Sequence, residues 1–162
     1  MKSSVRTVLL GAVLALVVAG CGGGGKTASG NGYHFALPAH WHSVAPSSAV
    51  EGAVYTRDGK TALLTIRSEA RVPIVSTRFI KSLDAEFRKN LKGYVPLAHR
   101  ILVTKAGPVF YFSYTQKSNG RLTSIILVPG HGKSFILDAV SNPSSKAATR
   151  DIASIFHTFV PR

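Results

Sequence analysis

Two histidines flank the single tryptophan of the chain, Trp41. Side chains two residues apart in an extended segment point to the same face, so His40 and His42 could supply half of a metal site. Completing it would need His34, His99 or an acidic residue. The alternative is a polar turn with both imidazoles on the surface and the indole in the core. We favour the turn, so the sequence predicts no bound metal.

Other patterns that support catalysis are weak or absent. The two closest acidic residues, Asp84 and Glu86, lie on different sides of a predicted helix and cannot act as a carboxylate pair. The Gly-x-Ser-x-Gly turn of many serine hydrolases does not occur. Residues 129–134 (PGHGKS) superficially resemble a phosphate loop, but they lie between two predicted strands and not before a helix. His157 is interpreted as a packing residue, and neither an enzyme nor a cofactor is expected.

The only cysteine, Cys21, follows a pattern that is typical of an export signal. Lys2 and Arg6 make the start positive, residues 8–18 are apolar, and two small residues precede the cysteine. The apolar run is too short to span a bilayer, which takes about 20 residues. Residues 18–21 (VAGC) resemble the bacterial lipobox. An ordinary cleaved signal with an accidental cysteine is the alternative.

The lipobox resemblance implies cleavage before Cys21, a covalent diacylglyceryl group on its sulfur and often an acyl chain, such as palmitate, on the new amino terminus. Two or three chains anchor a protein stably, because each buried methylene contributes about 0.8 kcal/mol. The predicted location is the extracytoplasmic side of the cell membrane. The expected organisation is a signal peptide (1–20), a lipidated cysteine with a flexible Gly-rich tether (21–32) and a globular domain (33–162).

The charge balance is strongly basic. The chain has 20 Lys and Arg against 7 Asp and Glu. Lys2 and Arg6 belong to the expected signal, so the rest keeps a net charge of +11. This favours anionic partners, such as lipid headgroups or acidic envelope polymers. Nucleic acid is not expected, because the basic residues are scattered and the anchor points away from the cytoplasm.

Hydrophobic periodicity predicts a helix over 76–91, with Asp84 and Arg88 spaced to pair and Gly93 just beyond its end. Its apolar stripe comprises Phe79, Ile80, Leu83, Phe87 and Leu91. A second helix is predicted over 144–159, with Ser144 or Ser145 as its N-cap. Its stripe comprises Ala148, Ile152, Ile155, Phe156 and Phe159.

Strand patterns surround the first of these helices. The Asp58-Gly59 pair predicts a two-residue type I′ turn between strands at 52–56 and 61–68. Four further strands are predicted at 97–105, 109–116, 122–128 and 134–141. Their short connections allow only an antiparallel meander. The fold class is therefore α+β, an antiparallel sheet with helices packed on it.

A family resemblance supports this fold. Residues 33–41 (YHFALPAHW) resemble the start of PsbP/Mog1-like domains, where a phenylalanine, an aliphatic residue and a proline precede a tryptophan. His40 stands where members of the family commonly have Gly or Asp. The order of elements is also similar, over about 33–160. The resemblance implies an α/β/α sandwich with non-enzymatic adaptor or assembly roles, and it transfers no functional residue.

The sequence therefore predicts a non-catalytic, membrane-anchored envelope lipoprotein that binds a protein or another envelope component. The alternative is a carrier or sensor of a small apolar or anionic ligand, which would require a cavity between the sheet and a helix. The aromatic residues Phe110, Tyr111, Phe112 and Tyr114 of one predicted strand could line such a cavity, although sheet core is the favoured interpretation. A hydrolase is less favoured still.

Overall fold

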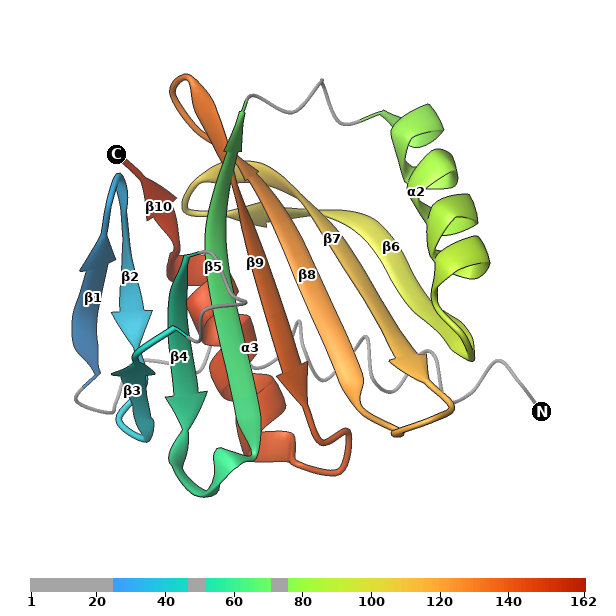
Figure 1. The fold of residues 1–162 in the computed structure, drawn as a ribbon. Helices are drawn as coiled ribbons and strands as arrows, with labels where there is room; N and C mark the ends of the chain where they lie inside the picture. The colour runs from blue at the N-terminus through green and yellow to red at the C-terminus, as the bar shows by residue number, and fades with distance from the viewer. Residues whose placement is uncertain (1–24, 47–51, 71–75) are drawn as a thin grey trace.

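Two antiparallel sheets and two α-helices form the part of the chain that the structure, a computed structural model, describes: residues 25–46, 52–70 and 76–162 (Figure 1). The larger sheet has the strand order β3-β4-β5-β9-β8-β7-β6. Its strands are β3 (Trp41–Val44), β4 (Ala53–Arg57), β5 (Ala62–Ala70), β6 (Tyr94–Thr104), β7 (Gly107–Gln116), β8 (Leu122–Pro129) and β9 (Lys133–Ser141). The smaller sheet, in the order β1-β2-β10, consists of β1 (Lys26–Gly30), β2 (Tyr33–Leu37) and β10 (Val160–Pro161).

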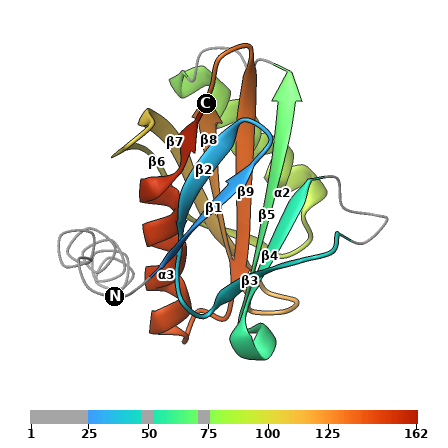
Figure 2. The same ribbon diagram turned by 90° about the vertical axis from the view of Figure 1, so that its left-hand side faces the viewer.

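The helices α2 (Thr77–Asn90) and α3 (Lys146–Thr158) lie on opposite faces of the seven-stranded sheet (Figure 2). This arrangement confirms the predicted α+β class with helices packed on an antiparallel sheet. Among the described residues, no helix has the length and apolarity needed to cross a bilayer.

Strands β6 to β9 form the predicted meander. Phe112 of β7 lies opposite His99 of β6 on one side and Ile125 of β8 on the other. Each strand joins the next by a tight connection, so neighbours in sequence are neighbours in the sheet. Strand β6 begins at Tyr94, three residues before its predicted start, and its pairing with β7 shifts between Pro96 and Ala98.

The face covered by α3 is densely packed. The side chain of Ser145 caps α3 by accepting a hydrogen bond from the Ala148 N–H. The predicted apolar stripe of this helix is buried throughout, with exposed fractions of 5% or less. It packs against alternate residues of the sheet and against Tyr33 and Phe35 of β2. The opening aromatic segment thus closes the core on this side.

The helix α2 covers its face only in part. Ser76 caps it by accepting a hydrogen bond from the Phe79 N–H, and Gly93 adopts the left-handed conformation (φ 75°) that lets the chain turn into β6. The predicted helix is therefore confirmed. However, no residue of α2 is buried, because its apolar stripe is only half-covered by the sheet.

Two local predictions are wrong. The segment expected to be a flexible tether forms β1 over Lys26–Gly30, pairing with β2 through backbone hydrogen bonds that need no apolar side-chain pattern. The expected two-residue turn at Asp58-Gly59 is a short 3-10 segment, Asp58–Lys60. Gly59 and Lys60 both have positive φ there, and the Asp58 N–H donates to the carbonyl of His40, so the tip of the hairpin bends toward the β2–β3 turn.

Candidate functional site

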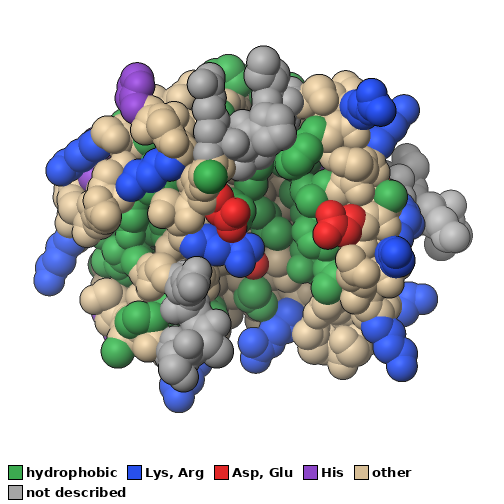
Figure 3. Space-filling model, turned by 45° about the horizontal axis from the view of Figure 1, so that its top comes forward, with side chains coloured by type: hydrophobic (Ala, Val, Ile, Leu, Met, Phe, Trp, Pro, Cys, Tyr) green, Lys and Arg blue, Asp and Glu red, His purple; other side chains and the backbone are tan. Residues whose placement is uncertain are grey.

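The incomplete cover of α2 leaves a hollow on its side of the sheet. Figure 3 shows this face, with hydrophobic side chains on both sides of a depression and acidic and basic side chains at its rim. The buried part of the cluster beneath α2 is small, and it comprises Phe110, Phe112, Tyr114 and Leu127. The half-buried side chains packed on it are Phe79, Ile80, Leu83, Phe87, Leu91, Tyr94, Ile125 and Ile136.

The aromatic side chains of β7 form the base of this cluster. The Phe112 side chain is completely buried, and its ring centroid lies 4.9 Å from that of Phe87 in α2. Phe110 makes an edge contact with Phe79. The sequence left open whether these rings line a pocket or form core, and the structure places them in the core. The half-exposed aliphatic residues Ile125 and Ile136 lie beyond the rings.

An acidic residue lies among these apolar side chains. Phe135, Leu137 and Ala139 of β9 point toward α3, so the alternating Asp138 points to the α2 side. It lies opposite Thr65 of β5 on one side and Ile125 of β8 on the other. The strand pairing therefore sets a carboxylate into the floor of the hollow.

Burial raises the pKa of Asp138, because a charged carboxylate is disfavoured away from water, and the opposite charge of Arg67 works against that shift. The Oδ1 atom of Asp138 is buried and has no hydrogen-bond partner among the described residues. Burial also raises the pKa of the nearby Tyr114, whose hydroxyl is hydrogen-bonded to Thr123. A buried acceptor without a partner costs about 1–3 kcal/mol, so this atom is suited to accept a hydrogen bond from a ligand.

A polar network borders the aromatic cluster where α2 meets β6. The Tyr94 hydroxyl donates to Asp84 Oδ1 over 2.9 Å, and Arg88 Nε donates to Asp84 Oδ2 over 2.8 Å. His99 lies 3.7 Å from Asp84 and stacks on Phe112, with ring centroids 4.3 Å apart. The predicted pairing of Asp84 with Arg88 is confirmed, and the network links α2 to β6, the first strand of the meander.

The pKa values in this network follow its contacts. Burial works to raise the pKa of Asp84, but the hydrogen bonds from Arg88 and Tyr94 outweigh it and lower that pKa. Burial lowers the pKa of His99, and attraction to Asp84 opposes this only in part. The pKa of Tyr94 is raised, first by burial and then by its bond to Asp84. Asp84 is thus held ionised as an acceptor that ties α2 to β6.

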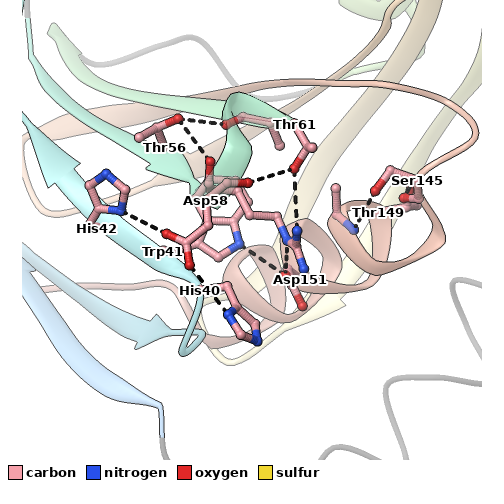
Figure 4. Close-up of polar contacts among 12 residues, drawn as sticks. His40, Trp41, His42, Thr56, Asp58, Thr61, Ser145, Thr149 and Asp151 are labelled. Carbon is pink, nitrogen blue, oxygen red and sulfur yellow. Dashed lines mark hydrogen bonds and ion pairs between the residues drawn. The ribbon is translucent and has the colours of Figure 1, made fainter.

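A second polar cluster lies at the other side of the molecule, around Trp41 (Figure 4). The indole N–H of Trp41 and the Nε–H of Arg57 both donate to Asp151 Oδ2, over 3.2 and 2.8 Å. Arg57 and Asp151 are each only 17% exposed. These bonds fasten β3 and β4 to α3, so we assign them a structural role.

The histidines beside Trp41 both turn toward Asp58 (Figure 4). His40 Nδ1 lies 3.5 Å from one carboxylate oxygen and His42 Nδ1 lies 3.4 Å from the other. All three side chains are more than half exposed. No group of three His, Cys, Asp or Glu residues in the described ranges is arranged to hold a metal ion. The arrangement matches the polar surface turn that the sequence favoured.

The remaining candidates from the sequence are dispersed. His34 accepts a hydrogen bond from Arg162, and residues 129–134 comprise the end of β8, a tight turn and the start of β9. His157 is half-buried on α3, and its carbonyl accepts from the Lys105 N–H. Cys21 and the expected signal peptide lie outside the described residues.

Sequence reasoning missed Asp138 and the hollow around it. The signal was present, because Asp138 interrupts the otherwise apolar segment 135–140 (FILDAV) of a predicted buried strand. A charged residue at such a position is rarely buried without a partner. What the sequence could not reveal is that α2 stops short of covering this part of the sheet.

Comparisons with known proteins show which solved structures share this fold. No protein-family model matches the sequence, and no curated protein does. The structure is similar to cyanobacterial PsbP (CyanoP) from Synechocystis sp. PCC 6803, at 14% identity and a TM-score of 0.61, over 88% of this chain and 96% of that one.

Two further solved structures are similar. LpqN, involved in cell envelope biogenesis of Mycobacterium tuberculosis, matches at 15% identity and a TM-score of 0.55, over 87% of this chain and 88% of LpqN. PA94 from Pseudomonas aeruginosa, a putative regulator of unknown function, matches at 11% identity and a TM-score of 0.53, over 87% of this chain and 99% of that one. This chain therefore has a PsbP-like fold, as residues 33–41 and the order of elements predicted.

Proposed function

We propose that this chain is a non-catalytic binding module of the cell envelope, held on the extracytoplasmic side of the membrane by lipid on Cys21. The lipobox-like residues 18–21 support the anchor, and the likeness to LpqN, which is involved in cell envelope biogenesis, supports the location. The hollow beside α2, where the helix leaves the sheet uncovered, is its ligand site. Of the two functions that the sequence suggested, this proposal takes the carrier of a small ligand, with the ligand as the envelope component that the module binds.

The single observation that carries the ligand site is the unpartnered Oδ1 of Asp138 on a floor of apolar side chains. Half-exposed aliphatic and aromatic groups favour an apolar ligand body, because covering them releases surface from water at roughly 25 cal/mol per Å². The lone acceptor favours a hydroxyl or amine that donates one hydrogen bond. The ligand is therefore an amphiphile with an apolar chain and a donor group.

Binding of fluorescent amphiphiles tests this site. A dansyl-labelled alkyl alcohol or amine should bind the wild type and lose most of its affinity with Ile136→Trp, which fills the floor. The control is Val103→Trp, because Val103 is 79% exposed on β6 and a larger side chain there leaves the floor unchanged. Equal binding by both variants and the wild type would refute the hollow as the site.

The role of Asp138 is tested with a matched pair of ligands. Asp138→Leu removes the acceptor and should weaken binding of the alcohol roughly tenfold, the value of a hydrogen bond of about 1.4 kcal/mol. Binding of the corresponding methyl ether, which has no donor, should not weaken. The same loss for both ligands would show that the carboxylate does not recognise a donor.

Metabolic labelling tests the anchor separately. The wild type expressed in a bacterium that processes lipoproteins should incorporate labelled palmitate and partition with membranes. Cys21→Ala should lose the label and its cleavage at this site, because no other cysteine is present. Label retained in Cys21→Ala would contradict lipidation at this residue, and it would leave the amphiphile assay unaffected.

A second candidate function is an adaptor for an envelope protein. It is favoured by two exposed aliphatic side chains on β6, an edge strand of the large sheet: Ile101 is 59% exposed and Val103 is 79% exposed. Cross-linking in native membranes followed by purification tests it. A defined protein that co-purifies with the wild type but not with Ile101→Asp/Val103→Asp supports the adaptor, whereas recovery of lipid alone supports the ligand carrier.

A further inference from the structure

Several connections that carry exposed cations meet at one end of the large sheet. The first residue of β8, Leu122, pairs with Ser141, the last of β9, and Ser141 pairs with Ala62, the first of β5. The connections before β5, before β8 and after β9 therefore share this end. The backbone N–H of Lys117 donates to the Gly93 carbonyl, which brings the α2–β6 turn to the same end.

The first described strand starts there too. Lys26 at the start of β1 pairs with Leu37, just before the β2–β3 turn. That turn touches the tip of the β4–β5 hairpin, where the Asp58 N–H donates to the His40 carbonyl. We call this end of the molecule the basic end, and its exposed cations are Lys26, Lys60, Lys92, Lys117, Arg121 and Lys146. Asp58 is the acidic residue in these described connections.

Charge alone does not select this end, because the opposite end is also basic. It carries Arg78, Lys105 and Lys133, together with the acidic Glu69. The length of chain before β1 does select it. Only Gly22, Gly23, Gly24 and Gly25 separate Cys21 from Lys26. Fully extended, the five steps from Cys21 to Lys26 reach about 18 Å.

The large sheet is longer than the reach of residues 22–25. These residues can therefore join Cys21 in the membrane to Lys26 only when one particular end of the sheet faces the bilayer. Strand β8 has eight residues, which span about 25 Å at roughly 3.3 Å each. If the opposite end faced the bilayer, Lys26 would lie about 25 Å above it, beyond the reach of the tether. With the basic end facing the bilayer, Lys26 lies next to its anchor.

We propose that the basic end docks on an anionic lipid surface and holds the domain upright on its membrane. This inference rests on the proposed lipid on Cys21. Cations within a Debye length of the surface, about 8–10 Å at physiological salt, are attracted to anionic headgroups. The hollow beside α2 lies on a face of the sheet and not at this end, so docking leaves it accessible to a ligand.

Energy transfer to the lipid surface tests the orientation. The lipidated protein is reconstituted in phosphatidylcholine vesicles, with or without phosphatidylglycerol, that contain a headgroup-labelled acceptor. Because Cys21 is blocked by its lipid, a donor dye can be placed at one introduced cysteine. Ser118→Cys labels the β7–β8 loop at the basic end, and His131→Cys labels the β8–β9 turn at the opposite end; both positions are exposed.

The donor at position 118 should transfer more efficiently than the donor at 131 in anionic vesicles. The difference should shrink in neutral vesicles, and in 1 M salt, where the Debye length falls to about 3 Å. Lys117→Gln/Arg121→Gln should lower the equilibrium constant for docking roughly 25-fold, at about fivefold per cation. The matched control, Arg78→Gln/Lys105→Gln at the opposite end, should leave it unchanged.

Each contrary outcome has a distinct meaning. Equal transfer from both positions, or more transfer from 131, would overturn the docking of the basic end even though the lipid is present. Orientation that appears only after adding an acidic envelope polymer would assign the basic end to that polymer and overturn the lipid proposal. An intact mass without lipid on Cys21 would refute the anchor itself, and the docking inference with it.

Discussion

Trp41 donates its indole N–H to Asp151, which lies 110 residues further along the chain, over 3.2 Å. Arg57 donates to the same carboxylate oxygen over 2.8 Å. One largely buried acceptor therefore joins the first two strands of the large sheet to the last helix. The tryptophan in the opening motif is explained by this role, since its ring lies in the core while its N–H reaches a partner.

Removing this acceptor should destabilise the protein. Asp151→Ala leaves the indole N–H of Trp41 and the Nε–H of Arg57 without their acceptor, where the Arg57 side chain is only 17% exposed. The expected loss is about 2–3 kcal/mol in the free energy of unfolding, measured by urea denaturation. Arg88→Ala is the control, because it breaks an ion pair whose arginine is 57% exposed and screened by water, so it should cost much less. Equal losses from the two variants would show that the hydrogen bonds of Trp41 and Arg57 to Asp151 contribute no more than an exposed ion pair.

Asp138 should make stability fall as pH rises. Its pKa in the folded protein is above the ordinary value of 3.8, chiefly because of burial. Between those two values the folded protein binds more protons than the unfolded chain, so the free energy of unfolding falls with rising pH. Asp138→Asn lacks this titration. The variant should therefore become more stable relative to the wild type as the pH rises above 3.8. Parallel stability curves would argue against a buried carboxylate.

His99 should respond to its acidic neighbour. Its pKa is lowered mainly by burial and partly restored by Asp84. Because the folded pKa lies below that of the unfolded chain, stability attributable to His99 is lost as pH falls below about 6.5. Asp84→Asn removes the attraction and should lower the pKa of His99 further, as read from imidazole NMR shifts. Glu86→Gln, on the exposed side of α2, should leave the pKa of His99 unchanged. If both variants shifted the pKa of His99 equally, the contact between Asp84 and His99 would not be its cause.

Gly52 should tolerate no side chain. Its φ of 116° is disfavoured for other residues, and a Cβ there would lie within 2.2 Å of the Ile66 carbonyl oxygen. Gly52→Ala should cost about 2–4 kcal/mol, measured as a shift in the thermal midpoint. Gly107 also has a positive φ of 91°, but nothing lies within 4 Å of its Cβ position, so Gly107→Ala should cost only about 1 kcal/mol. Similar losses at both positions would show that the backbone moves to relieve the clash between a Cβ at position 52 and the Ile66 carbonyl oxygen.

The sequence by itself determined both α-helices and the meander. The stripe from Phe79 to Leu91 and the stripe from Ala148 to Phe159 require a helical period, and short connections permit only antiparallel neighbours. Side-chain patterns predict an element poorly where backbone hydrogen bonds alone hold it in place. Strand β1 is polar and Gly-rich, and it is held by hydrogen bonds to β2 that leave no trace in side-chain periodicity.

Only the tertiary structure decided which groups meet. The two stripes look alike in the sequence, yet one is fully buried and the other half-covered, because cover depends on where a helix sits over the sheet. That placement exposes the floor around Asp138. The sequence likewise shows many scattered cations, but strand pairing and the turns between strands gather six of them at one end of the large sheet, including Lys26 at the start of β1. Such meetings arise from pairing between segments far apart in the chain, and no local pattern records them.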